Sequence, residues 1–390
     1  MAFGDGTADE LLRTSWAQFC DRLKAAGDLV FKPANPAEPI MRADGYHFLT
    51  QNLAEMGARI MKIERPPHGD NARHLGQGAF EAVNRGKQSL LVDLKDETQR
   101  ALVRDLIASA DIVVESYRPG VMARLGLDAA ALCRAYPRLI YVSLSGYGQT
   151  GPWANLPGHD INYLAAAGVL AVSGQPNGAP AQSFGLPVAD LCGTMYALSA
   201  TLAALFQREA TGRGQYLDVA LADCALHWMN PRLGAYRSAG ARTVEAQREA
   251  TLVKAAYGAF QCKDGRYVSI AALEDHFWKR LCTALPLAPF DGPEYATHKV
   301  RKAVADTINL RIEQAMQLLE SQEAFELLCR YDVPAAPVVH PAELSSQAHF
   351  ASRGKFAAGD DMPWVRFPVA MEGMGDTDLA GAPALGSVGG

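Results

Sequence analysis

The sequence lacks the motifs that mark metal, disulfide and nucleotide sites. Its seven cysteines are scattered, and no two of them form a Cys-x-x-Cys pair. An odd number at irregular spacing is typical of free thiols in a reducing compartment. The zinc motif His-Glu-x-x-His is missing, and so are Gly-x-Gly-x-x-Gly and Gly-x-x-x-x-Gly-Lys-Ser/Thr. We therefore expect no metal, dinucleotide or nucleoside triphosphate site.

The sequence is also short of positive charge and of long apolar runs. Its 37 lysines and arginines stand against 42 aspartates and glutamates, which gives a net charge of -5. A nucleic-acid binder that relies on bulk positive charge is therefore not expected. No uninterrupted apolar run reaches the roughly 18 residues of a membrane span, and no basic segment followed by an apolar one is visible at the start. We expect no membrane segment, no signal peptide and a cytoplasmic location.

What the chain does contain is an alternation of short β-like runs and amphipathic helices. A chain of 390 residues exceeds one comfortable core, so about two domains are expected. Between residues 58 and 145 the alternation indicates an α/β fold with a parallel sheet. The turn Lys263-Asp264-Gly265 indicates a hairpin in a smaller α+β domain. The expected parts are an atypical N-terminal segment at 1–44, a large domain at 45–227, a small domain at 228–332 and a return segment at 333–390.

The tract GHDINYLAAAG at residues 158–168 carries the first chemical signal, together with Asp190. Histidine side chains ordinarily titrate near neutrality, which suits His159 to proton transfer, and a carboxylate held ionised can also take or give a proton. Two such groups on opposite faces of a flat intermediate can remove a proton from a weakly acidic carbon and return one to the other face. Asp190 follows Pro187 at an expected helix start, where the helix dipole favours its charge and backbone N–H groups could stabilise an oxyanion.

Both residues also have an ordinary structural interpretation. A histidine followed by an aspartate is often a surface turn, and an aspartate at a helix start is often a cap. The residue types alone leave both interpretations open.

Further motifs occur in a fixed order along the chain. They are GARIMKIERP at 57–66, NRGKQSL at 84–90, DLK at 93–95, VESYRPGV at 114–121, GYGQTGP at 146–152, Ala189-Asp190, and TGRGQ at 211–215. With the 158–168 tract they resemble the class III CoA-transferase family, also called the CaiB/BaiF type, and within it the α-methylacyl-CoA racemase branch. The resemblance runs from about Gly57 to the end of the chain.

The resemblance implies a Rossmann-like large domain, a small domain and a homodimer whose two chains interlock like links. It implies an acyl-CoA substrate and no separate cofactor, because coenzyme A is part of the substrate. The aspartate that matches Asp190 is a nucleophile in the transferases, where it forms an anhydride and then a thioester, and one of two acid/bases in the racemases. A histidine matching His159 is usual in the racemases and usually missing from the transferases, so it favours the racemase branch.

Other candidate site residues also follow from the resemblance. Glu274 matches a small-domain glutamate that supports the histidine, although by itself it fits a helix start. Asp160 either tunes the site or caps the following helix. Arginine and lysine suit the phosphates of coenzyme A, although each one alone could be a solvated surface charge. The positions that match the lining of the coenzyme A site are Arg65, Val92, Asp93, Lys95, Glu115, Tyr117, Arg118 and Arg124, with Gly158 near the pantetheine end.

The N-terminal part departs from the family pattern. Family members begin with a strand and a Gly-Pro turn, whereas residues 44–50 stand here where that turn and the next helix should begin. Residues 1–44 look foreign to the family, and we expect the first strand of the sheet to be missing. Losing a central strand would leave the ladder groups of its neighbours unpaired.

The leading prediction is a racemase or epimerase that inverts the 2-position of 2-methyl-branched acyl-CoA thioesters through an enolate. His159 and Asp190 would be its two acid/bases. One alternative is a CoA-transferase that moves coenzyme A between an acyl-CoA and a carboxylate through an Asp190 thioester. The other is an inactive coenzyme A-binding fusion or truncated paralogue, which the missing strand suggests.

Overall fold

A parallel sheet of six strands forms the centre of the larger part of the molecule. The computed structural model describes residues 29–31, 44–74, 76–357, 364–370 and 379–388. Within them the strand order is β3-β2-β1-β4-β5-β6, which is the order of a doubly wound sheet. The α/β fold class is therefore confirmed. The strands are β1 (Leu29–Phe31), β2 (Ile60–Glu64), β3 (Gln88–Leu91), β4 (Ile112–Glu115), β5 (Ile140–Ser145) and β6 (Tyr216–Ala220).

The short strand β1 corrects the expectation that the first strand is missing. Val30 lies opposite Met61 of β2 and Val113 of β4 in parallel register, so β1 joins the two halves of the sheet. Three residues suffice because the neighbouring strands on both sides supply ladder partners. A run this short carries no periodic signal in the sequence, and the prediction of a missing strand is wrong.

The two faces of the sheet bury alternate side chains, as a pleated strand requires. Ile112 and Val114 of β4 join one core, whereas Val113 between them joins the core on the opposite face. Because helices cover both faces, β4 carries the apolar residues Ile112, Val113 and Val114 in succession. The first core is closed by α2 (Asp44–Glu55), α7 (Asp160–Ala166), α8 (Val188–Thr211) and α9 (Leu221–Trp228), and the second by α4 (Glu97–Ser109) and α6 (Ala129–Ala135).

Helix α8 is the longest of the described helices and the one that carries Asp190. By length and composition alone it could cross a membrane, but 56% of its most apolar window is buried inside the structure. It packs there against α2, α9, β5 and β6. Gly212 ends the helix with a φ of 71°, the left-handed conformation that glycine adopts without strain. The burial favours a core helix.

Residues 379–388 run along β3, which is an edge strand. The backbone N–H of Ser89 donates to Ser387 Oγ at 3.1 Å, and its carbonyl accepts the N–H of Val388 at 3.0 Å. Gly386 N–H donates to Ser89 Oγ at 3.1 Å. The outer backbone groups of Ser89, in the middle of β3, are thereby occupied.

An antiparallel sheet and its helices form the smaller part. β7 (Tyr257–Gln261) and β8 (Tyr267–Ala271) pair as the predicted hairpin, with Gly265 of the turn at a φ of 78°. β9 (Ala335–Pro337) adds to β8, so the segment expected to return to the large part first supplies a strand here. The helices are α12 (Asp275–Ala284), α13 (His298–Ala303), α14 (Ala305–Met316) and α15 (Ser321–Arg330).

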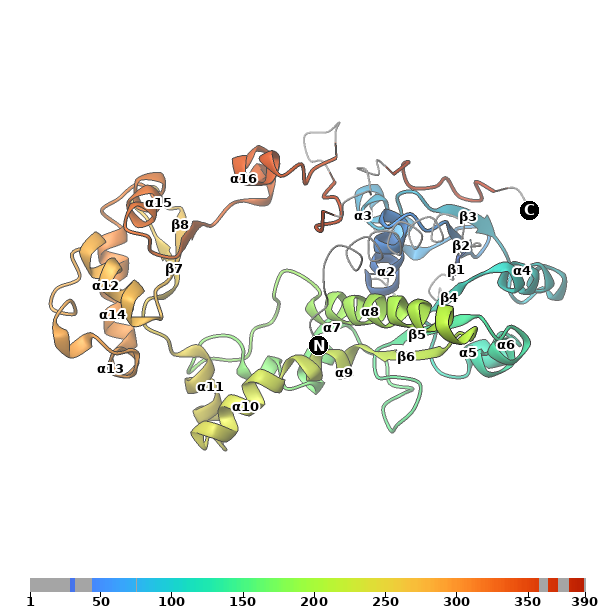
Figure 1. Ribbon diagram of the computed structural model, residues 1–390, viewed down its shortest axis with the longest axis horizontal. Helices are drawn as coiled ribbons and strands as arrows, with labels where there is room; N and C mark the ends of the chain where they lie inside the picture. Colours follow the sequence, from blue (N-terminus) through green and yellow to red (C-terminus); the bar gives the residue numbers. More distant parts are fainter. Residues whose placement is uncertain (1–28, 32–43, 75, 358–363, 371–378, 389–390) are drawn as a thin grey trace, which may run out of the picture.

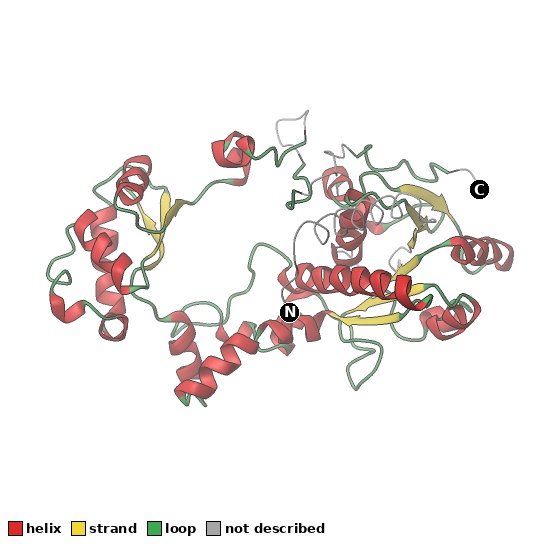
Figure 2. Cartoon of the chain, in the orientation of Figure 1, coloured by secondary structure: helices red, strands yellow, loops and turns green. Residues whose placement is uncertain are grey.

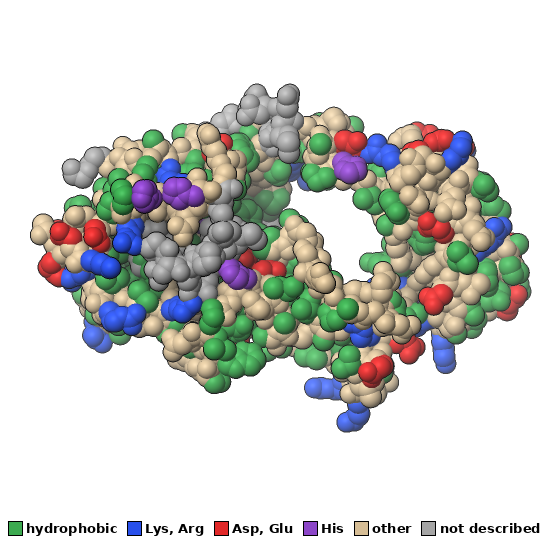
Figure 3. All heavy atoms as spheres, turned by 180° about the vertical axis from the view of Figure 1, so that it is seen from behind, with side chains coloured by type: hydrophobic (Ala, Val, Ile, Leu, Met, Phe, Trp, Pro, Cys, Tyr) green, Lys and Arg blue, Asp and Glu red, His purple; other side chains and the backbone are tan. Residues whose placement is uncertain are grey.

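Two connections join the two parts (Figure 1). The chain leaves α9 through α10 (Asn230–Ala239) and α11 (Val244–Leu252), and it returns from β9 through η4 (Pro341–Ser346) and α16 (Ala348–Ser352). The described residues of both connections lie in helices and loops (Figure 2). With all heavy atoms drawn, an opening still lies between them (Figure 3). The remaining short elements are η1 (Asn71–His74), α3 (Gln77–Ala82), α5 (Val121–Arg124), η2 (Leu170–Val172) and η3 (Pro293–Tyr295).

Candidate active site

A pocket of about 70 Å³ opens at the carboxyl ends of β4 and β5. This edge is where ligands bind in open α/β sheets. The pocket brings together His159, Gly158 and Asp190, which the sequence separates by up to 32 positions. Its described lining is Tyr46, Ser116, Tyr117, Arg118, Pro119, Leu144, Ser145, Gly146, Tyr147, Ala154, Leu156, Gly158, His159, Tyr163, Asp190 and Leu221.

Asp190 lines the pocket from the first turn of α8. Its side chain is only 8% exposed, because α8 is a core helix. The first turn is the positive end of the helix dipole, which favours a negative charge there. The carboxylate is thus fixed by a rigid element and borders the space that a ligand can enter.

Asp160 is a cap for the helix that carries Asp190. Its Oδ1 accepts the backbone N–H of Ala189 at 2.6 Å and that of Asp190 at 3.2 Å. The sequence left Asp160 between tuning the site and capping the helix that follows it; it lies at the start of α7 but caps α8. Because both N–H groups are engaged, they are not the oxyanion donors that the helix start suggested.

His159 is exposed at the rim of the pocket, as the cap residue of α7. Its backbone N–H donates to Asn162 Oδ1 at 2.9 Å, which fixes the first turn of that helix. The preceding Gly158 is buried, and its carbonyl accepts the hydroxyl of Tyr163 at 2.6 Å. A Cβ at Gly158 would lie 2.6 Å from the Tyr163 ring. Glycine is therefore required for this close approach.

The loop after β4 brings three of the predicted coenzyme A residues to the same place. Glu115 is buried, where it accepts the Ser143 hydroxyl and, at 2.7 Å, the backbone N–H of Tyr117. Glu115 thus positions the loop, whereas Tyr117 and Arg118 line the pocket. Ligand contact from this loop would come from the last two residues.

The other predicted coenzyme A residues lie outside the described pocket lining. Arg65 and Lys95 are exposed after the ends of β2 and β3, and Arg124 is exposed on α5. Val92 is buried, and Asp93 accepts the backbone N–H of Lys95 at 3.0 Å in a turn. Arg65 follows the carboxyl end of β2, and Val92, Asp93 and Lys95 follow that of β3, so these four lie at the same edge of the sheet as the pocket.

Glu274 is the predicted residue that the structure does not bring to the pocket. It is the exposed cap residue of α12 in the smaller part. Figure 1 places α12 across the opening from α7 and α8. Within one chain Glu274 therefore does not support His159.

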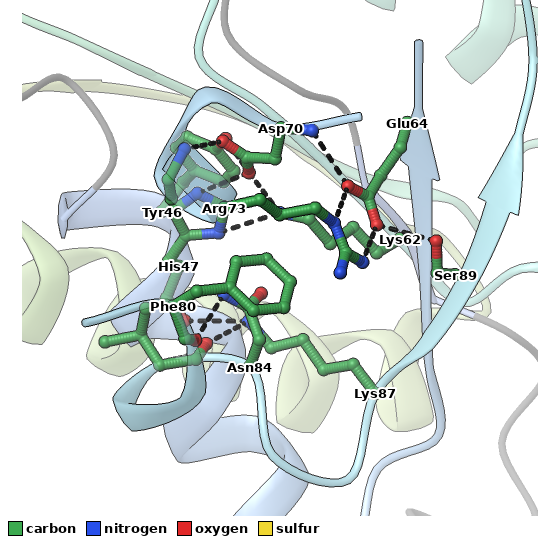
Figure 4. A network of polar contacts seen from close by, with 12 residues as sticks. Tyr46, His47, Lys62, Glu64, Asp70, Arg73, Phe80, Asn84, Lys87 and Ser89 are labelled. Atoms are coloured by element: carbon green, nitrogen blue, oxygen red, sulfur yellow. Dashed lines mark hydrogen bonds and ion pairs between the residues drawn. The ribbon is translucent and has the colours of Figure 1, made fainter. Parts of the chain in front are cut away.

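A cluster of buried charged side chains lies next to the pocket, and the sequence did not predict it (Figure 4). Lys62 on β2 forms an ion pair with Asp70 and lies 3.1 Å from His47 Nδ1. His47 Nε2 lies 2.8 Å from Asp70 Oδ2. All three side chains are at most 1% exposed. These contacts fit a neutral imidazole that accepts from Lys62 at Nδ1 and turns Nε2 toward Asp70.

The electrostatics of the cluster agree with that assignment. Burial and the charge of Lys62 lower the pKa of His47 to about 3. Burial opposes the charge of Asp70, but Lys62 and His47 outweigh it and hold the pKa of that carboxyl well below its usual range. The cluster is therefore an ion pair bridged by a neutral ring.

A second ion pair extends the cluster along β2 and β3. Glu64 is 0% exposed and accepts from Arg73 at 2.6 and 2.8 Å and from the Ser89 hydroxyl at 2.6 Å. Burial raises the pKa of Glu64, and Arg73, Lys62 and Ser89 together lower it below its usual value. The bidentate contact is the strong form of an arginine–carboxylate pair.

Residues 44–50, which depart from the family pattern, contribute one residue to the pocket and one to the buried cluster. Residues 44–50 form the first half of α2. Tyr46 lines the pocket and His47 belongs to the buried cluster. The departure thus changes the residues at the pocket rather than removing an element.

Comparison with known proteins gives a consistent result. The family model described as CoA-transferase family III matches residues 47–388. Acetyl-CoA:oxalate CoA-transferase of Acetobacter aceti is 32% identical over 91% of this chain and 94% of its own length. Succinate–glutarate CoA-transferase of Agrobacterium fabrum is 31% identical over 82% of this chain and 84% of its own.

A solved structure agrees with the fold. The CaiB/BaiF family protein from Brucella suis superimposes with a TM-score of 0.78 at 29% identity, over 93% of this chain and 96% of that one. The family predicted from the sequence is confirmed. The racemase prediction gains no support from these relatives, which are named as CoA-transferases, and the transferase alternative does.

Proposed function

This chain belongs to CoA-transferase family III, and from that premise we propose that it moves coenzyme A from an acyl-CoA to a free carboxylate, with Asp190 as the nucleophile. The observation that carries the proposal is the Asp190 carboxylate, fixed in the first turn of α8 and bordering the pocket at the carboxyl edge of the sheet. The names of the relatives favour small acids, so we propose acetyl-CoA or succinyl-CoA as donor and oxalate or glutarate as acceptor.

The proposed chemistry needs only carboxylates and one thiolate. An Asp190 oxygen forms a bond to the thioester carbon, the C–S bond breaks, and coenzyme A leaves as a thiolate. The thiolate attacks the Asp190 carbonyl of the resulting anhydride, which releases the donor acid and leaves an Asp190 thioester. The acceptor carboxylate attacks that thioester, the C–S bond breaks, and coenzyme A leaves again as a thiolate. The thiolate then attacks the acceptor carbonyl of the new anhydride, which gives the acceptor acyl-CoA and restores the Asp190 carboxylate. No net proton, electron or metal is consumed.

Neighbouring residues support this chemistry by position. Asp160 caps α8 and holds the backbone of Asp190, which keeps the nucleophile aligned. Arg118 lies in the pocket lining, and its charge suits an acceptor carboxylate or a phosphate of coenzyme A. His159 at the rim suits proton transfer to or from a bound acid.

The test is trapping of the proposed intermediate. The protein is mixed with acetyl-CoA and hydroxylamine, digested, and examined by mass spectrometry for a hydroxamate at Asp190. Product formation from acetyl-CoA and each candidate acceptor is followed by chromatography. Asp190→Asn removes both signals, whereas Asp105→Asn on the exposed face of α4 keeps both. Turnover with unmodified Asp190 contradicts the nucleophile assignment.

One observation keeps the racemase as a second candidate. His159 and Asp190 line the same pocket, as a two-base proton transfer needs. Incubating a 2-methylacyl-CoA in deuterated water separates the two functions: α-deuterium incorporation that His159→Ala abolishes, without coenzyme A transfer, would favour racemisation.

We also propose an interlocked homodimer. The opening between the two connections and the distance of Glu274 from the pocket of its own chain both suit a second copy that passes through the opening. Light scattering on the purified protein tests this, and a monomer at the concentration of full activity contradicts it.

A further inference from the structure

Tyr46 belongs to both the pocket and the buried cluster. Its side chain is 2% exposed and lines the pocket that holds Asp190. Its hydroxyl donates to Asp70 Oδ2 at 3.4 Å (Figure 4). The hydroxyl therefore points into the cluster, and the pocket meets the apolar ring.

The ring is held from several sides. The His47 ring lies 4.0 Å from it, centroid to centroid, and the ammonium of Lys62 lies 5.8 Å from its centroid. Asp70 is fixed in turn by Lys62, by His47 and by the backbone N–H of Ala72 at 2.9 Å. Turning the hydroxyl toward the pocket would draw it away from a buried carboxylate, which is costly.

The pocket is small, so the position of the Tyr46 ring affects the size of the group that fits inside it. A water-sized group needs on the order of 10–15 Å³, so a pocket of about 70 Å³ has room for a few such groups. That is the size of a short acyl group. The other apolar walls come from Leu144, Tyr163 and Leu221, which are at most 8% exposed and packed in the main core.

We propose that the Tyr46 ring sets the upper size limit of the acyl group that reaches Asp190. The inference deepens the proposed function, on which it rests for the identity of the ligand as an acyl-CoA. It assigns the limit to the bulk of the ring and not to the hydroxyl. Replacing the ring by a methyl group opens the wall toward α2, whereas removing the hydroxyl alone leaves the wall in place.

The test uses ligands that cannot react. S-ethyl-CoA and S-octyl-CoA are thioethers, so their binding is measured by calorimetry whether or not the protein transfers coenzyme A. In Tyr46→Ala the affinity ratio of octyl to ethyl rises by about tenfold or more, since a hydrophobic pocket discriminates single methylenes by about that factor. In Tyr46→Phe the ratio stays within about threefold. Tyr331→Ala, at an exposed tyrosine of the smaller part, is the control and leaves the ratio unchanged.

The outcomes separate the two proposals. An unchanged ratio in Tyr46→Ala, or an equal shift in Tyr46→Phe, overturns the size limit while transfer activity still supports the proposed function. A shifted ratio without any transfer by the unaltered protein overturns the function and keeps the size limit. No binding of either thioether to the unaltered protein overturns both. If thermal unfolding shows that Tyr46→Ala is not folded, Tyr46→Leu is measured instead. Its affinity ratio of octyl to ethyl is expected to rise as well.

Discussion

The pocket and the buried cluster use the same residue types but hold them in opposite ways. In the cluster the carboxylates of Glu64 and Asp70 are 0% exposed, and each faces a cationic side chain. Asp190 borders space that a ligand can enter, and Asp160, outside the described pocket lining, is held by backbone N–H groups of α8. Tyr46 lines the pocket and also contacts Asp70 of the cluster.

The difference shows how one edge of a sheet can serve stability and chemistry separately. Buried ion pairs fix a geometry, and breaking one leaves an uncompensated charge inside the protein. A backbone cap fixes the position of a carboxylate with dipoles instead of a full positive charge. Variants of the cluster should therefore change the free energy of unfolding, and variants of the pocket should change turnover.

The largest expected contrast is between two aspartates changed in the same way. Asp70→Asn leaves Lys62 without its carboxylate in the interior and lowers the free energy of unfolding by about 3–5 kcal/mol. Asp190→Asn lowers coenzyme A transfer by roughly 10³-fold or more, with a change in stability below about 1 kcal/mol. Guanidinium unfolding and the chromatographic transfer assay measure the two effects. Equal losses of stability would remove the distinction between the two sites.

A second prediction concerns the close contact between Gly158 and the Tyr163 ring. In Gly158→Ala the new methyl group meets the Tyr163 ring, and overpacking of this kind costs about 1–3 kcal/mol. Gly234 is the matched control. It lies inside α10, and a Cβ added there would meet open space, so Gly234→Ala raises the free energy of unfolding by about 0.5–1 kcal/mol. Thermal unfolding of both variants gives the comparison, and a stabilising Gly158→Ala would contradict it.

The buried cluster should make the stability of the protein depend on pH, because it contains His47. Its pKa of about 3 in the folded protein lies below the ordinary 6.5, so the unfolded chain takes up the proton first as the pH falls. Stability is therefore present above pH 6.5 and is lost on acidification, by up to about 2 kcal/mol between pH 7 and pH 5. Burial is the largest cause of this lowered pKa; the charges of Lys62 and Lys87 lower it further, and Asp70 opposes them.

His47→Gln supplies the matched measurement. It keeps a polar side chain at the same place but cannot titrate, so its unfolding free energy changes less between pH 7 and pH 5 than that of the unaltered protein. Parallel pH profiles for the two proteins would mean that His47 has the same pKa in the folded and unfolded states.

The smallest expected effect on stability comes from the helix caps. Asp160→Ala and Asp128→Ala each remove a side-chain cap, of α8 and of α6, and each costs about 0.5–2 kcal/mol. Only Asp160→Ala also lowers the turnover number, because only α8 carries Asp190. If both variants keep full turnover, the cap of α8 does not align the nucleophile.

Much of the large sheet follows from local patterns, and β1 shows where such patterns stop. β4 and β5 are apolar runs between turn signals, so they could be placed from the sequence. β1 has three residues, and its strand conformation depends on β2 and β4 on either side. A signal of that kind exists only once the neighbours are in place.

The site also contains residues that the sequence could nominate and contacts that it could not. His159 and Asp190 could be nominated because their chemistry is suited to the role and because motifs identified the family. The cap by Asp160 spans 29 positions, and the contact between Lys87 and the His47 carbonyl spans 40, which no spacing rule reaches. Lys62 and Glu64 did leave one trace: charged residues at alternate positions of an apolar strand, IMKIE, indicate buried partners.

The strap of residues 379–388 along β3 has a consequence for the order in which the protein is made. Ser89 and Ser387 are 298 positions apart, so β3 leaves the ribosome long before its cover exists. A nascent chain therefore carries an open sheet edge through most of its synthesis, and an open edge recruits other strands. A chain cut before residue 379 would keep every residue of the pocket and lose the protection of its sheet against aggregation.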